Sequence, residues 1–315
     1  MGDYYSHSRI KSWRRCKRSH YYKYIMELVR RTAPAALLRG TTFHEMLDAP
    51  IQGKDWKEPL IAYREVYEKL WDEEREQYPS PDDLISMYER YQRRWAHDGL
   101  DYEGKSEITV LAEHRGMTFK GIIDKLPVDH NGIRFVMDHK THKVLPDENT
   151  RFADLQTVLY YWACLQNGMD VGGVLWDYIR TKPPAIPELL KTGGLSKRSN
   201  IDTDYDTYYR EIKKHDLNPA NYSDILEKVK KNVFFKRVPL PGPSPVLVEN
   251  VVKDFFDTAE EIRDNPECAT RNMTRDCKSC TYFNLCSAEV RGLDTEFIIK
   301  QMYVIQPRKE EDVNP

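Results

Sequence analysis

The stretch MTFKGIIDKLPVDHNGIRFVMDHK, residues 117–140, decides the fold. It contains two segments rich in β-branched residues, Met117–Val128 and Gly132–Lys140, joined by a His-Asn-Gly turn. A third segment of this kind, Glu107–Glu113, precedes them and is joined by an Arg-Gly turn. Short apolar segments separated by such turns are typical of antiparallel strands. The sequence therefore predicts a three-stranded antiparallel meander.

The elements that follow extend the meander into a larger sheet. We expect a helix at Arg151–Gln166 and a buried strand at Val171–Ile179, and this β–β–β–α–β order predicts a mixed sheet with helices packed on it. The fold class is therefore α/β. Residues Pro183–Asn200 are expected to form an exposed loop. Phe234–Val238 is expected as an edge strand, ended by prolines at Pro239–Pro245.

Most of the remaining chain has the pattern of amphipathic helices, because Leu, Ile, Tyr and Trp recur every three or four residues between charged positions. The expected helices are Ser8–Tyr24, Ala35–Ala49, Trp56–Gln77, Asp82–Ala96, Asp204–Lys214, Asn221–Lys231 and Val246–Arg263. We divide the chain into a helical region (1–100), a core (101–240), a C-terminal helix and cysteine region (241–290) and a tail (291–315). The last residues, Pro307–Pro315, are expected to be disordered.

Composition limits the class of protein. The chain has 315 residues, 40% of them hydrophobic and 31% charged, which is typical of a globular protein with a real core. A net charge of −2 argues against a protein that coats nucleic acid, but a DNA enzyme can still hold a local basic channel. No run approaches the ~18 apolar residues of a membrane span. The amino terminus has no apolar signal core, so we expect a cytoplasmic protein without a membrane partner.

The meander carries the first candidate site residues. Asp124 lies on the second expected strand, and Asp138 and Lys140 lie at the end of the third. Because side chains alternate along a strand, Asp138 and Lys140 share a face while His139 points away. A hairpin can place Asp124 beside them. Carboxylates suit hard divalent cations, so these residue types predict a metal site that acts on phosphodiesters.

Two further segments supply polar residues that could join this site. Upstream, LLRGTTFHEML places His44 on a helix that begins after Gly40. Downstream, DLQTVLYYWA places Gln156 and Tyr160 one helical turn apart. Glutamine is a poor choice for an otherwise apolar helix face, so its amide is expected to face something polar.

The six cysteines are more typical of metal ligands or free thiols than of disulfides in a cytoplasmic chain. Three form a C-x2-C-x5-C group, Cys277, Cys280 and Cys286, and a fourth candidate, Cys16, lies near the amino end. Four thiolates can hold zinc or an iron–sulfur cluster, and the spacing alone leaves both open.

The ordered set G-x3-H, GIID, D-x-K and Q-x3-Y resembles the PD-(D/E)XK nuclease superfamily in its RecB-like branch, over roughly Ile10–Ile179. The resemblance implies a restriction-endonuclease-like core in which Mg²⁺ or Mn²⁺ is bound by His44, Asp124 and Asp138. It also implies that Lys140 is the catalytic lysine, with Gln156 and Tyr160 supporting the site or the DNA. The family often has glutamate at the second acidic position, where this chain has Asp138.

The cysteines extend the resemblance to a branch that contains CRISPR-adaptation nucleases, AddB-type subunits and phage exonucleases. In that branch one early and three late cysteines hold a [4Fe–4S] cluster that joins the two ends of the nuclease domain. The resemblance implies this role for Cys16, Cys277, Cys280 and Cys286, with structural Zn²⁺ as the alternative.

The function implied is a metal-dependent DNA exonuclease acting on single strands or DNA ends in recombination, repair or replication, and a phage origin fits the same resemblance. Two alternatives remain open: a structure-specific endonuclease, and an inactive iron–sulfur subunit that only binds DNA. Candidate contacts to the DNA backbone are the basic segments Arg9–Arg18 and Lys191–Arg198. One chain leaves open whether the protein assembles with itself or with other proteins.

Overall fold

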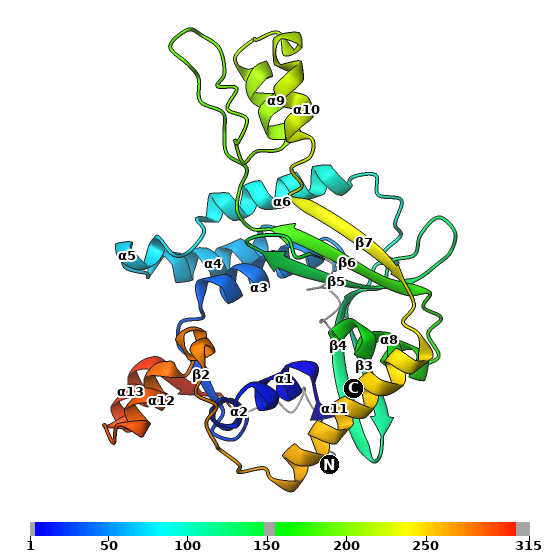
Figure 1. Ribbon diagram of the computed structural model, residues 1–315, viewed down its shortest axis with the longest axis vertical. Coiled ribbons are helices and arrows are strands. Elements are labelled where there is room, and N and C mark those ends of the chain that lie inside the picture. The colour runs from blue at the N-terminus through cyan, green and yellow to red at the C-terminus, as the bar shows by residue number, and fades with distance from the viewer. Residues whose placement is uncertain (1–3, 148–154, 307–315) are drawn as a thin grey trace.

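The computed structural model describes residues 4–147 and 155–306. At its centre is a six-stranded mixed sheet in the order β1-β4-β5-β6-β7 (Figure 1). The sixth strand, β3, also pairs with β4. The strands are β1 (Tyr4–Tyr5), β3 (Ser106–His114), β4 (Met117–Lys125), β5 (Phe135–His142), β6 (Gly173–Arg180) and β7 (Phe235–Pro241). The expected α/β fold with a mixed sheet flanked by helices is confirmed.

Strands β4 and β5 separate soon after they meet. Strand β3 pairs with β4 along its whole length, whereas the β4–β5 ladder consists of one antiparallel pair, Lys125 opposite Met137. Strand β1 instead pairs in parallel with β4 at Thr118 and Phe119. The expected antiparallel meander is present, and its second hairpin opens on one side of the Lys125–Met137 pair.

Helices cover both faces of the sheet. On one face, α1 (His7–Arg15), α8 (Gln156–Gln166) and α11 (Pro245–Asp264) form a core with residues of β3, β4 and β5. On the other, α3 (Ala35–Asp48), α4 (Glu58–Glu68) and α6 (Pro81–Trp95) pack around Ile179 and Phe235. Burial of each large side chain contributes about 1.5–3 kcal/mol, so both layers hold the strands in place.

The prediction of one helix over Ser8–Tyr24 is wrong at Cys16. That residue is extended, with φ −167° and ψ 114°, and it divides the segment into α1 and α2 (Lys17–Tyr24). The expected helix at Trp56–Gln77 is likewise interrupted, between α4 and the short α5 (Asp72–Arg75). Periodic apolar spacing does not reveal such single-residue breaks.

One other boundary differs from the expectation, and two further expectations reach outside the described residues. Strand β7 continues through Pro239 to Pro241, which an edge strand tolerates because its outer N–H groups need no partner. Helix α8 begins at Gln156, and the first residues of the expected Arg151–Gln166 helix fall in 148–154, outside the described residues. The expected disorder of Pro307–Pro315 also lies outside them.

The described part of the expected tail at 291–315 contains regular structure. After η2 (Arg275–Ser279) and α12 (Phe283–Val290), the chain forms α13 (Thr295–Met302) and β8 (Tyr303–Ile305). Strand β8 pairs with β2 (Leu28–Arg30) in a separate two-stranded sheet. Asp294 caps helix α13, and the apolar face of this helix packs on the cluster around Tyr282. The two ends of the chain therefore form one module.

A projection extends from the sheet between β6 and β7 (Figure 1). It contains the irregular segment predicted at Pro183–Asn200 and two helices, α9 (Tyr205–Lys214) and α10 (Ser223–Val229), which follows η1 (Pro219–Tyr222). The projection has its own small core, formed by Leu195, Tyr208, Ile212, Tyr222, Ile225, Leu226 and Val229. Across the described part of the chain, no helix combines the length and apolar character needed to cross a membrane.

Candidate active site

The alternation of β5 places Asp138 and Lys140 on the α8 face of the sheet. Asp138 is only 4% exposed, and its Oδ2 lies 2.9 Å from the Nζ of Lys140. His139, between them in sequence, points to the opposite face and is buried against α6. The predicted sharing of a face by Asp138 and Lys140 is therefore present.

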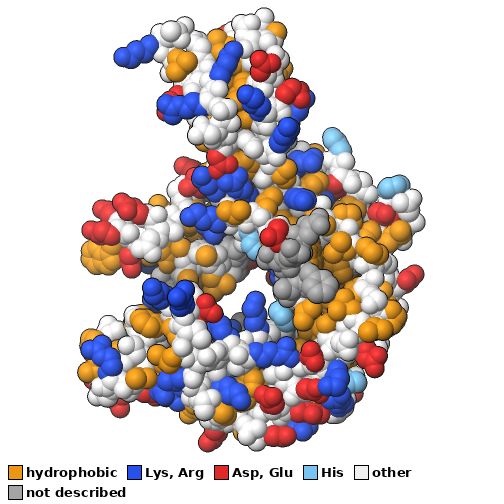
Figure 2. Space-filling view, in the orientation of Figure 1, with side chains coloured by type: hydrophobic (Ala, Val, Ile, Leu, Met, Phe, Trp, Pro, Cys, Tyr) orange, Lys and Arg blue, Asp and Glu red, His pale blue; other side chains and the backbone are white. Residues whose placement is uncertain are grey.

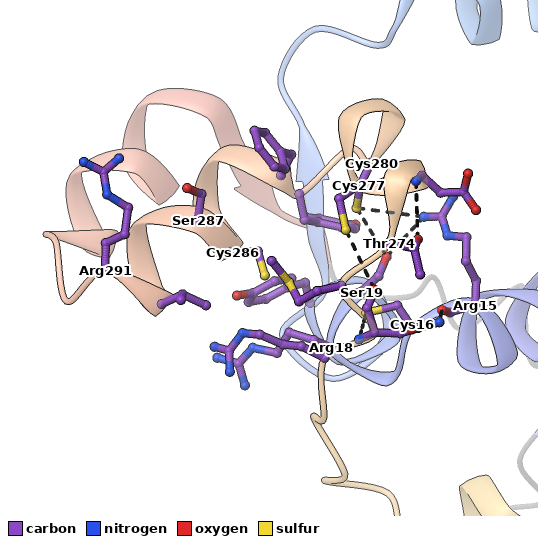
Figure 3. Close-up of a pocket in the computed structure, with 18 residues that line it drawn as sticks. Arg15, Cys16, Arg18, Ser19, Thr274, Cys277, Cys280, Cys286, Ser287 and Arg291 are labelled. Carbon is purple, nitrogen blue, oxygen red and sulfur yellow. Dashed lines mark hydrogen bonds between the residues drawn. The ribbon is translucent and has the colours of Figure 1, made fainter.

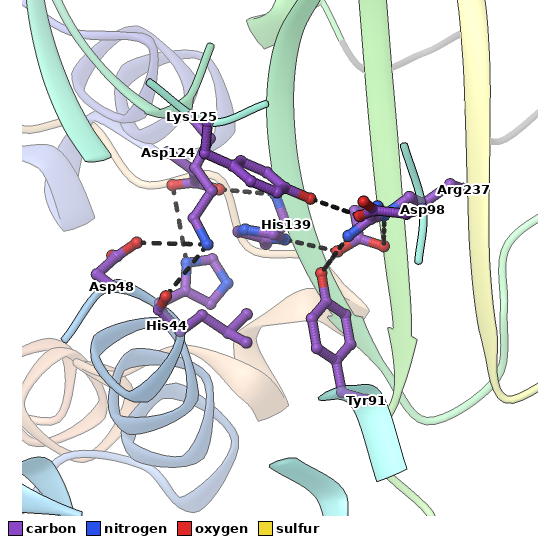
Figure 4. Close-up of polar contacts among 11 residues, drawn as sticks. His44, Asp48, Tyr91, Asp98, Asp124, Lys125, His139 and Arg237 are labelled. Carbon is purple, nitrogen blue, oxygen red and sulfur yellow. Dashed lines mark hydrogen bonds and ion pairs between the residues drawn. The ribbon is translucent and has the colours of Figure 1, made fainter. Parts of the chain in front are cut away.

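Asp124 lies at the point where β4 and β5 separate. In the antiparallel register, Asp124 and Asp138 both lie directly beyond the Lys125–Met137 pair, on the same side of it. The Oδ2 of Asp124 accepts a hydrogen bond from the backbone N–H of His139 at 2.6 Å (Figure 4). The carboxylate thus joins the two strands where their backbones no longer pair.

His44 reaches this carboxylate from the neighbouring helix. Its Nδ1 lies 3.8 Å from Oδ1 of Asp124 (Figure 4). Helix α3 approaches the sheet closely at Gly40, where an added Cβ would lie 3.3 Å from Oγ1 of Thr141 on β5. A glycine one helical turn before His44 therefore lets the imidazole reach the strand ends.

The charges at this site reinforce one another. Burial opposes ionisation of Asp124, but the contact with His44 and the hydrogen bond from the His139 amide outweigh it and lower its pKa to about 2. Burial lowers the pKa of His44, but Asp124 and the further charges of Asp138 and Asp48 raise it overall. The site therefore favours anionic carboxylates facing cationic or metal-binding partners.

A chain of hydrogen bonds continues from Lys140 into α8. The Nζ of Lys140 donates to Oε1 of Gln156 at 2.8 Å, and Nε2 of Gln156 donates to the hydroxyl of Tyr160 at 2.6 Å. Burial raises the pKa of Tyr160 to about 12, so its hydroxyl stays protonated. The structure therefore brings together Asp138, Lys140, Gln156 and Tyr160, as the motif spacing suggested.

Gly121 on β4 gives Tyr160 the room that this chain requires. A Cβ at position 121 would lie 2.7 Å from Cε1 of the Tyr160 ring and 3.0 Å from Cε1 of Phe119. We expect Gly121→Ala to lower stability by about 1–3 kcal/mol through overpacking and to displace Tyr160 from Gln156. Chemical denaturation measures the first effect and DNA cleavage the second. Ile122→Ala on the same strand, at an exposed position, is the control, and equal losses in both variants would contradict this account.

Two groups behind the site were not predicted from the sequence. Asp48, one turn after His44, lies 3.8 Å from Nζ of Lys125, and burial raises its pKa to about 7. On the far face of β5, Nδ1 of His139 lies 2.7 Å from Oδ2 of Asp177, which is fully buried.

Asp177 is the centre of a buried polar network. Tyr91 donates a hydrogen bond to it, and Arg237 ion-pairs with both Asp177 and Asp98 (Figure 4). An aspartate inside the apolar strand segment GVLWDYIR was the available sequence signal. The network connects β5, β6 and β7 to α6 and fixes the strand that carries Asp138 and Lys140.

The donor set fits a hard divalent ion, because two carboxylates and one imidazole are ligand types of Mg²⁺ and Mn²⁺ sites. In their present positions, however, the described residues contain no group of three or more His, Cys, Asp or Glu side chains arranged to hold an ion. His44 is drawn to Asp124, and Asp138 to Lys140. The side chains predicted to bind the metal therefore lie near one another, but in the described residues they do not form a three-ligand metal site.

The predicted cysteine ligands line one cavity of about 240 Å³ between the two ends of the chain (Figure 3). Cys16 enters from the break between α1 and α2, and Cys277, Cys280 and Cys286 enter from the C-terminal segment. The Asn272 N–H donates to Sγ of Cys16 at 3.5 Å, and Arg15 donates to Sγ of Cys280 at 3.9 Å. As with the carboxylates, no three of these thiols converge on a single point.

Comparison with known proteins places the chain in a family. No curated protein matches the sequence. A solved candidate exonuclease from Eubacterium rectale has a similar fold, with a TM-score of 0.50 and 11% identity over 87% of this chain and 86% of that one. The solved structure of SSO0001 is 12% identical over 82% of this chain and 98% of that one, and its TM-score of 0.29 carries no argument. The model of the PD-(D/E)XK nuclease superfamily matches residues 4–287. This chain therefore belongs to the PD-(D/E)XK nuclease superfamily, whose members are generally metal-dependent nucleases.

Proposed function

We propose that this protein is a metal-dependent DNA exonuclease that acts on single strands or DNA ends. One observation carries the proposal: His44, Asp124, Asp138 and Lys140 come from three elements and meet where β4 and β5 separate. Two carboxylates, an imidazole and an ammonium group in one place are the parts needed to hydrolyse a phosphodiester.

Each side chain has a role that follows from its contacts. His44, Asp124 and Asp138 would hold the divalent ion, which supplies Lewis-acid stabilisation and lowers the pKa of a bound water. Lys140, held by Asp138 and Gln156, presents its ammonium group to the charge that develops on the phosphate oxygens. Tyr160 fixes the Gln156 amide and so limits the rotation of Lys140. His139 holds Asp124 through its backbone N–H.

A cavity of about 630 Å³, lined by apolar and basic residues and by Asp254, supports DNA as the substrate. It lies between α1, α8 and α11, and its lining includes Lys11, Arg14 and Arg15. Figure 2 shows a hollow at the middle of the molecule, with Lys and Arg side chains along its lower rim. Phosphate contacts from such side chains provide affinity without base recognition, as an end-directed nuclease requires.

Exonuclease and endonuclease action are distinguished by the topology of the substrate. We expect rapid release of nucleotides from linear single-stranded DNA with Mg²⁺ or Mn²⁺, and no cleavage of the same DNA in a covalently closed circle, because an exonuclease needs an end. Gel electrophoresis of both forms, with each end labelled in turn, provides the measurement. Cutting of the circle would replace the proposal with a structure-specific endonuclease. Binding without cleavage of either form would favour the inactive accessory subunit.

We further propose that Cys16, Cys277, Cys280 and Cys286 hold a [4Fe–4S] cluster. All four line one cavity, and N–H donors face two of the sulfurs, as is usual for cluster-ligating thiolates. A single zinc ion requires four sulfurs about 2.3 Å from one point, whereas a cluster spans several atoms. Four thiolates that line one cavity can hold either group, and analysis of bound iron and zinc distinguishes the two.

A further inference from the structure

A second basic pocket lies at the base of the projection, outside the active site. It encloses about 350 Å³ between α6, the first turn of α9 and the start of β7. Five basic side chains and two carboxylates line it, along with the apolar residues Val233, Phe234 and Phe235. The basic residues are Arg90, Arg93, Arg94, Arg210 and Lys230, and the carboxylates are those of Asp204 and Asp206.

Arg90 forms the floor of this pocket, which we name the Arg90 pocket. Its side chain is 8% exposed, and among the described residues its buried Nε and Nη1 have no hydrogen-bond partner. The guanidinium packs over the Phe235 ring at 5.5 Å, which stabilises the charge but satisfies no N–H group. Burial, together with the charges of Arg210 and Arg93, lowers its pKa to about 10 although Asp204 opposes the shift. A buried guanidinium with unsatisfied N–H groups is stabilised by a hydrogen-bond acceptor, and an anion both accepts such bonds and neutralises the charge.

The carboxylates near the pocket do not supply that anion. Asp204 caps α9 by accepting from the Thr207 N–H at 2.8 Å. Asp206 is exposed at the rim. Lys230 is paired with Glu227, and Arg93 lies 3.9 Å from Glu89.

Both Arg93 and Arg210 are exposed at the opening of the pocket. Partial burial lowers the pKa of Arg93, and repulsion from the charge of Arg210 lowers it further. The positive end of the α9 dipole faces the same space. Positive charge is therefore in excess at the pocket, above a floor with unsatisfied donors.

We propose that the Arg90 pocket binds a backbone phosphate of a DNA strand away from the catalytic centre. Arg90 would donate hydrogen bonds to the phosphate oxygens from the floor of the pocket, and Arg93 and Arg210 would pair with the phosphate from the rim. This inference rests on the proposed function, since DNA is the polyanion such an enzyme handles. The pocket would hold the strand while the active site cuts it.

Two neighbouring features favour a DNA strand over a free anion. Tyr205 lines the pocket and stacks on Tyr209, with centroids 5.7 Å apart and planes 9° apart, so aromatic side chains lie beside the proposed phosphate site. Lys and Arg side chains also gather on the projection above the pocket (Figure 2). A single phosphate ion would need neither feature.

The test compares Arg93→Gln/Arg210→Gln with wild type, because both side chains are exposed and their replacement spares the fold. Binding of labelled poly(dT) is measured in EDTA by fluorescence anisotropy, with a long strand and with one of about 5 nucleotides that covers a single site. We expect the affinity for the long strand to fall about tenfold and its salt slope to fall by about 1, with the short strand unchanged. The control is Lys253→Gln/Arg263→Gln on α11, which removes the same charge at exposed positions.

An unchanged affinity and salt slope for the long strand would overturn the proposal, as would equal losses in the control. Inorganic phosphate that raises the melting temperature of wild type, with unchanged DNA binding in the variant, would show a site for a free anion and would also overturn it. Hydrolysis of the small diester thymidine 5′-p-nitrophenyl phosphate separates this outcome from failure of the proposed function. Wild type and variant should hydrolyse it equally. If neither does, the catalytic proposal fails and the binding result is judged on its own.

Discussion

Replacing Lys140 with methionine should reduce DNA cleavage on the order of 100- to 1000-fold, because the site loses the only ammonium group that contacts Asp138 among the described residues. Methionine keeps the length and apolar stem of lysine and removes the charge. Asp138→Asn should have an effect at least as large, since it removes the carboxylate proposed as a metal ligand, which is also the partner of Lys140. Initial rates on linear single-stranded DNA with saturating Mn²⁺ provide the measurement.

The control for charge loss is Lys253→Met, an exposed lysine on α11, which should cut DNA at the wild-type rate. Circular dichroism and DNA affinity in EDTA should show that Lys140→Met and Asp138→Asn remain folded and still bind. If both variants cut at the wild-type rate, Asp138 and Lys140 have no catalytic role and the proposed function must be withdrawn.

Cys280→Ser should remove bound iron and lower the melting temperature by roughly 10 °C, because ligation free energy at a structural metal site is folding free energy. Cys280 lines the same cavity as Cys16, and its Sγ accepts a hydrogen bond from Arg15 at the end of α1. Iron and sulfide analysis of protein purified without oxygen, together with thermal unfolding, provides the measurement. Absorbance near about 400 nm should disappear with the iron.

Cys268→Ser is the matched control, since Cys268 is partly buried yet does not line the cavity. It should keep full iron content and stability. Colourless wild-type protein with one equivalent of zinc would assign the four thiols to zinc. Equal stability of Cys280→Ser and Cys268→Ser in metal-loaded protein would remove both metals from consideration.

Local rules were enough to predict the strands that carry the candidate site. Alternation along β5 places Asp138 and Lys140 on one face, and turn residues fix the hairpins that bring Asp124 near them. The 3.6-residue period likewise predicts Gln156 and Tyr160 on one face of α8. These relations span few residues, so the sequence contains them directly.

Contacts between segments that are distant in the sequence could not be predicted from those local rules. The network around Asp177 requires Tyr91, Asp98 and Arg237, which come from three separate parts of the chain. Cys16, at the break between α1 and α2, lines a cavity together with a segment more than two hundred residues away. The pairing of β8 with β2 has the same origin. Only the folded topology determines such partners.

The module formed by the two chain ends constrains when the protein can mature during synthesis. Strand β2 leaves the ribosome early but has no partner until β8, at Tyr303–Ile305, has been made. Trp13 and Arg14 also wait for α11, whose Glu261 and Thr258 accept their hydrogen bonds. A nascent chain that already contains His44, Asp124, Asp138 and Lys140 therefore still lacks the contacts of β2 with β8 and of α1 with α11. Assembly of this nuclease fold is completed only after Tyr303–Ile305 has been made.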